Sequence, residues 1–178
     1  MSILVTKHTR LRNLTVLFAA IVMPGGASAQ TLADLLKNSS PEELATAFKA
    51  ICLDHPSDAA GEATAAQAAP WTLKLDGKAG KRSAVYRAWP LQLTLSDQST
   101  TESCMLTSSM SENLTLADVA EKATAALAIT NAKPRIASDT VYWTTEDNAE
   151  GKSIAFKMFP GAGTKVGNFI LVTRKAAK

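Results

Sequence analysis

SPEELATAFKAIC, residues 40–52, is the stretch that decides the fold, because it predicts a helix with one face that needs a partner. Ser40 can cap the helix, Pro41 suits its first turn and Glu43 can complete a capping box. The apolar side chains share one face at helical spacing: Leu44, Phe48, Ile51 and Cys52. Cys52 therefore points inward from the last turn, where it can reach a sheet.

Two further helices are predicted outward from this one. Residues 58–69 are rich in alanine and lack large apolar side chains, so they form either a thin helix packed close to a neighbour or a mobile linker. Trp71 directly after Pro70 argues against a pure linker. A helix from Thr115 to about Asn131 is indicated by a cap and an apolar stripe at positions 116, 119, 120, 123 and 127.

Most of the remaining chain alternates apolar and polar residues, which is typical of half-buried strands. Strands are expected near 71–75, 84–89, 91–97 and 101–108, and a three-stranded meander is expected over the last 40 residues. This order predicts an α+β fold: a single antiparallel sheet of five to seven strands with two to three helices packed on one face. Such a sheet is PAS-like or profilin-like in topology alone, which says nothing about function.

Residues 1–29 have the layout of a secretory signal peptide. Its parts are a basic start, an apolar run and small residues for cleavage: Lys7, Arg10 and Arg12; Leu14 to Met23; and Ala27-Ser28-Ala29. The run of ten residues is about half of the roughly 20 that span a bilayer, so we expect cleavage after Ala29 and no transmembrane segment after signal removal. The expected localisation is periplasmic or secreted.

Length and charge then limit the classes of protein. Removing 29 of the 178 residues would leave 149, enough for one domain with a real core. The expected organisation is a signal peptide at 1–29, an N-terminal arm or short helix at 30–39 and a single α+β domain at 40–178. The leader holds three basic residues and no acidic one, so the formal charge of +3 falls to zero without it. Nucleic-acid binding is therefore disfavoured.

Cys52 and Cys104 are the two cysteines of the chain. An even pair in an oxidising compartment usually forms a disulfide, which here would tie the first helix to the sheet. Two free thiols, or a catalytic or metal-binding cysteine, are the alternatives. No metal site and no cofactor are predicted, because the pair lacks further soft ligands nearby.

Few residues suggest chemistry. Asp54, His55 and Ser57 are the residue types of a hydrolase triad, but triad members usually come from separate segments that converge in space. We therefore name no catalytic residue, and ending a helix is the simpler role for this segment. Trp71, Trp89 and Trp143, with His55, are the residues that could line a ligand cavity. Each tryptophan falls in a strand pattern, so core packing is the favoured interpretation.

The layout of Cys52, an alanine-rich stretch, Trp71 and Cys104 resembles that of small exported proteobacterial proteins of uncharacterised function. The likeness covers about residues 40–110, and it implies a periplasmic bacterial protein with a helix-to-sheet disulfide but no particular activity. Pro70 stands where those proteins would have glycine.

These observations favour a non-enzymatic exported domain that binds a partner protein or a small ligand. The rival hypothesis is a periplasmic hydrolase whose site, near His55, assembles only in three dimensions. The sequence does not identify the ligand, the partner or the oligomeric state.

Overall fold

The computed structural model describes residues 39–129, 132–144, 152–161 and 163–174. The predicted signal peptide at 1–29 and all of the predicted arm except Ser39 lie outside these residues, so both remain predictions. Ser39 forms a parallel bridge to Met110, and its hydroxyl lies 2.7 Å from that of Ser108. The described chain therefore begins beside the end of the strand that closes with Met110.

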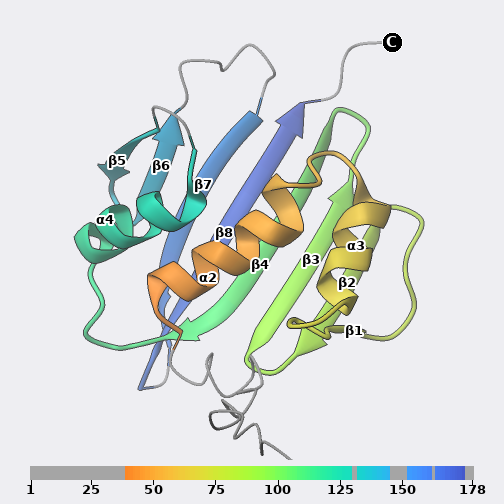
Figure 1. Ribbon diagram of the computed structural model, residues 1–178, viewed down its shortest axis with the longest axis horizontal. Coiled ribbons are helices and arrows are strands. Elements are labelled where there is room, and N and C mark those ends of the chain that lie inside the picture. The colour runs from red at the N-terminus through yellow and green to blue at the C-terminus, as the bar shows by residue number, and fades with distance from the viewer. Residues whose placement is uncertain (1–38, 130–131, 145–151, 162, 175–178) are drawn as a thin grey trace, which may run out of the picture.

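The described residues form three helices and eight strands (Figure 1). The helices are α2 (Pro41–Phe48), which continues as a π-helical turn over Lys49–Leu53, α3 (Ala59–Gln67) and α4 (Leu116–Leu127). The strands are β1 (Lys74–Leu75), β2 (Ser83–Ala88), β3 (Leu91–Asp97), β4 (Thr101–Met110), β5 (Lys133–Ala137), β6 (Thr140–Thr144), β7 (Lys152–Pro160) and β8 (Lys165–Arg174). The predicted α+β class is confirmed.

All eight strands form a single sheet in the order β1-β2-β3-β4-β8-β7-β6-β5, with every neighbouring pair antiparallel. Two four-stranded meanders, β1–β4 and β5–β8, meet where β4 pairs with β8, and α4 connects them. Figure 1 shows the three helices on the same side of the sheet, as predicted. We call this the helix face and the opposite side the open face.

The predicted count of five to seven strands is too low, and β5 is the strand that the sequence interpretation missed. Pro134 follows the predicted end of the preceding helix, near Asn131, by only three residues, yet it lies in β5 at the edge of the sheet. An edge strand tolerates proline because one row of its backbone groups has no ladder partner. The strand predicted over 71–75 is also shorter than expected: Thr72 has a φ of +50°, and only Lys74–Leu75 pair.

The core lies between the helix face and the helices. Leu91, Leu93 and Leu95 alternate into it from β3, as their spacing predicted. Phe169 on β8 is its centre, with ring centroids 5.1 Å from Phe48 on α2, 5.6 Å from Trp143 and 4.8 Å from Phe156. Aromatic pairs at these distances add to the stability that their buried area provides.

The predicted capping box at Ser40 and the predicted cap at Thr115 are both confirmed. The Ser40 amide donates to Glu43 Oε2 at 2.9 Å, and the Glu43 amide donates to Ser40 Oγ at 3.2 Å. Thr115 and Asp118 do the same at the start of α4. These caps satisfy amides that have no partner inside the helix, and they fix where each helix begins.

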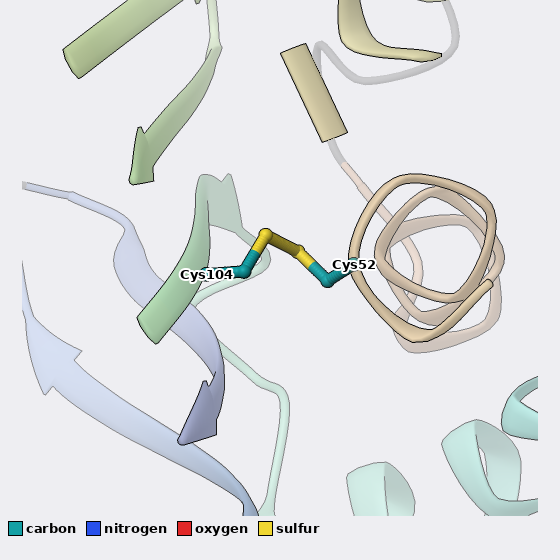
Figure 2. Close-up of a disulfide and its surroundings, with 2 residues drawn as sticks. All are labelled: Cys52 and Cys104. Carbon is teal, nitrogen blue, oxygen red and sulfur yellow. A yellow bond between two sulfur atoms is a disulfide. The ribbon is translucent and has the colours of Figure 1, made fainter. Parts of the chain in front are cut away.

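Cys52 and Cys104 form the predicted disulfide, with their Cα atoms 5.7 Å apart. Figure 2 shows it running from the helical turn after α2 to strand β4. The bond closes a loop of 52 residues that contains α3 and the first three strands. It therefore joins the helix layer to the middle of the sheet.

Candidate functional site

A cavity of about 320 Å³ lies between α3 and the ends of strands β2, β3 and β4. We call it the α3 pocket and define it by six of its lining residues: Glu62, Tyr86, Leu95, Asp97, Glu102 and Ser103. Lys81 and Arg82, in the loop before β2, are exposed and also line it. The pocket thus combines carboxylates, hydroxyls and a basic loop with a partly apolar wall.

Helix α3 supplies the most unusual side chain. The segment is a helix and not a linker, and Asp58 caps it by accepting a hydrogen bond from the Gly61 amide at 3.0 Å. Glu62, Ala63 and Ala66 are its buried residues. Glu62 is thus the one large side chain on the buried stripe of this helix, and it lines the pocket.

Glu62 is only 5% exposed, which is rare for a glutamate without an ion-pair partner. Within the described ranges no hydrogen bond or ion pair to its carboxyl group is found. Burial is the main cause that raises the pKa of Glu62, and the negative charges of Glu102 and Asp58 add to it; together they raise this pKa from 4.5 to about 7. The group is therefore half protonated near neutral pH.

His55 belongs to the turn that precedes α3. A Cβ atom on Gly61 would lie 3.0 Å from His55 Nδ1 and would collide with Asp58 Oδ2. Glycine at this position therefore lets the imidazole and the capping carboxylate pack against the first turn of the helix. His55 is not one of the residues that line the α3 pocket.

The three tryptophans do not share a cavity. Trp143 is 3% exposed and its indole N–H donates to Thr124 Oγ1 at 2.7 Å, so core packing is confirmed for it. Trp71 is half-buried against the core after α3. Core packing is wrong for Trp89, which is 82% exposed in the two-residue turn between β2 and β3. Alternation stops at a turn, and the indole there points away from the core.

Neither family models nor curated proteins nor solved structures match this chain. The resemblance to small exported proteobacterial proteins, and the PAS-like or profilin-like topology, therefore remain predictions. In the part of the chain that the structure describes, no group of three His, Cys, Asp or Glu side chains is placed to hold a metal ion. No helix among the described residues is both long and apolar enough to cross a membrane.

Sequence reasoning missed Glu62, although a signal for it exists. If 58–69 is read as a helix, Glu62 and Ala66 are four residues apart and share a face. The buried face of this helix must then include either Glu62 or the other polar residues, and Thr64 and Gln67 are exposed. Composition alone does not single out Glu62, because eight residues in the range 59–69 are alanine or glycine.

Proposed function

We propose that this protein is an exported, non-enzymatic binding domain whose α3 pocket takes a small ligand with an amino group. The observation that carries the proposal is Glu62: a buried carboxyl group that faces a cavity and lacks a protein partner among the described residues. Carboxyl groups with a perturbed pKa concentrate at functional sites, because binding or catalysis requires them there even though they destabilise the fold. The Cys52–Cys104 disulfide supports export to an oxidising compartment.

The charge balance favours a cationic group, because the carboxylates that line the pocket, Glu62, Asp97 and Glu102, outnumber the basic side chains Lys81 and Arg82. Glu102 and Asp58 add negative potential around Glu62, so an anionic ligand would raise the free energy of the ionised carboxylate further. An ammonium group would instead pair with it in a partly desolvated site, where such pairs form short charge-assisted hydrogen bonds. A volume of about 320 Å³ is within the lower range of small-ligand pockets.

Binding would be linked to protonation. An ammonium ligand needs Glu62 ionised, and below its pKa of about 7 the site must first release a proton. Affinity should therefore fall as the pH falls, by about tenfold between pH 8 and pH 6 for one group of that pKa.

The experiment compares 1,4-diaminobutane with 1,4-butanediol, and butylamine with 1-butanol, by calorimetry and amide NMR at pH 8 and pH 6. We expect only the amines to bind, with shifts of amide signals in α3 and β4. Glu62→Gln should abolish binding, whereas Glu121→Gln, on the exposed side of α4, should not. The proposal fails if no amine binds, or if Glu62→Gln binds as tightly as the original chain.

A further inference from the structure

The open face of the sheet differs from the helix face in charge. Strand positions alternate between faces, so the register assigns each charged side chain to one side. Within the described strands, the charged residues of the open face are all basic: Lys74, Arg87, Lys133, Arg135, Lys157 and Arg174. Asp97 and Glu102, which are the acidic residues in the described strands, face the helix side and line the α3 pocket. The open face therefore has only basic charged residues in these strands, whereas the helix face has the two acidic ones together with Lys152 and Lys165.

A row of polar side chains crosses the open face along one line of paired positions. Its members pair in sequence from β2 to β7: Arg87 with Gln92, Gln92 with Thr107, Thr107 with Asn168, and Asn168 with Lys157. Four steps between neighbouring strands give it a length of about 19 Å. We call these five residues the polar row.

One atom of the polar row lacks a partner. Asn168 Oδ1 is buried and accepts no hydrogen bond from any described residue. A buried acceptor without a donor is costly, and such atoms are often satisfied by a ligand or an ordered water.

Trp89 lies at one end of the polar row, beside a second cavity. This cavity has a volume of about 300 Å³, and Arg87, Trp89, Gln92, Thr107 and Ser109 are among its lining residues. The indole is 82% exposed, so a flat ligand face can stack on it. Arg87 Nε contacts Asp76 at 3.1 Å, which uses one of the five N–H donors of its guanidinium group.

We propose that the polar row and Trp89 bind a chain of acidic sugars on the open face. Amide and hydroxyl side chains match sugar hydroxyls, the exposed indole offers a stacking surface, and the cations at the two ends match carboxylate groups. Single-stranded DNA fits less well, since its backbone has no hydroxyl groups to pair with the uncharged Gln92, Thr107 and Asn168 in the middle of the polar row. Arg87 and Lys157, the two cations of the polar row, also pair with Asp76 and Asp139, so an acidic sugar would use the remaining N–H donors of these cations.

This site is independent of the α3 pocket, because it lies on the other face of the sheet. The test titrates the full chain with oligogalacturonate, hyaluronan and heparin oligosaccharides, with maltohexaose as the neutral control and a thymidine oligonucleotide as the rival polyanion. We expect at least one acidic sugar chain to bind, to weaken with added salt and to quench Trp89 fluorescence. Maltohexaose should bind at least about tenfold more weakly.

Trp89→Ala and Arg87→Gln should each weaken binding by about tenfold, as expected for residues that dominate an interface. Tyr142→Ala and Arg135→Gln are matched controls, since both residues are exposed on the open face outside the polar row. Circular dichroism would verify that all four variants fold. The proposal is overturned if no acidic sugar chain binds, if the oligonucleotide binds more tightly, or if Trp89→Ala and Arg87→Gln behave like their controls. Glu62→Gln should leave this binding unchanged.

Discussion

Glu62 is the residue at which stability and binding oppose each other. Its carboxyl group is buried under α3, and its pKa is raised to about 7 from the value of 4.5 expected in the unfolded chain. The folded state therefore holds this proton more tightly than the unfolded state does. Stability from this group is greatest at acidic pH and is lost as the pH rises from about 4.5 through about 7.

Glu62→Gln should remove this pH dependence. At pH 8 the variant should be more stable than the original chain by up to about 3 kcal/mol, because no charge has to be buried. At pH 4, where Glu62 is protonated in both states, the two chains should differ little. Urea unfolding at both pH values measures the difference, and Glu121→Gln is the exposed control. An equal free energy of unfolding at pH 8 would show that Glu62 titrates normally.

Trp143 offers a second test at the scale of a residue. Its buried indole N–H donates to Thr124 Oγ1, and that hydroxyl in turn donates to the carbonyl of Ala120. Thr124→Val keeps the shape but leaves the indole N–H unpaired, which should cost about 1–3 kcal/mol. Thr64→Val is a close control, because Thr64 donates to Ala60 in the same way but is exposed. Comparable losses in the two variants, measured by thermal unfolding, would contradict the structural role of the indole hydrogen bond.

At the scale of elements, local chemistry decided what could be predicted. The starts of α2 and α4 follow from caps that are complete within four residues of sequence, and both are found where expected. The alternation of Leu91, Leu93 and Leu95 likewise fixes the buried side of β3. Strand β5 could not be predicted in this way, since its edge position, which tolerates Pro134, arises from pairing with β6.

Strand β8 contains a position where only glycine fits. A Cβ atom on Gly167 would collide with Met110 Sδ and would lie 2.7 Å from the Phe156 ring. These side chains cover the glycine on the helix face, so Gly167→Ala should displace them and destabilise the fold by about 1–3 kcal/mol. Adding the second change Met110→Ala should recover less than the whole loss, because Phe156 still blocks the methyl group. Chemical denaturation checks both variants, and an unaffected Gly167→Ala would mean that the core yields more easily than the packing indicates.

The whole molecule is organised by the disulfide and by the two faces of the sheet. The sequence was sufficient for the class of fold, the cysteine pair and the side on which the helices pack. It was not sufficient for the candidate sites, because the α3 pocket and the polar row collect residues from several strands whose register depends on the complete sheet. Glu62 and Asn168 gain their importance only through those neighbours.

Cys104→Ser should lower the free energy of unfolding by about 2–5 kcal/mol, since the native bond restricts a 52-residue loop in the unfolded chain. The double variant Cys52→Ser, Cys104→Ser should lose a similar amount, because either change removes the same bond. The disulfide also joins the turn before α3 to the strand that carries Glu102, so its loss should weaken amine binding in the pocket. Denaturant titration and calorimetry measure the two effects. A loss of stability below about 1 kcal/mol would contradict the loop-entropy argument.

The most direct test of the account is a ¹³C NMR titration of the side-chain carboxyl carbon of Glu62. Selective labelling of glutamate, with Glu62→Gln to assign the signal, gives the protonation midpoint of this one group. The buried position under α3 predicts a midpoint near 7, moving to lower pH when 1,4-diaminobutane is added. A midpoint near 4.5 would show that the carboxyl group is solvated. If amines also failed to shift this midpoint, the result would contradict the proposal that the α3 pocket binds them.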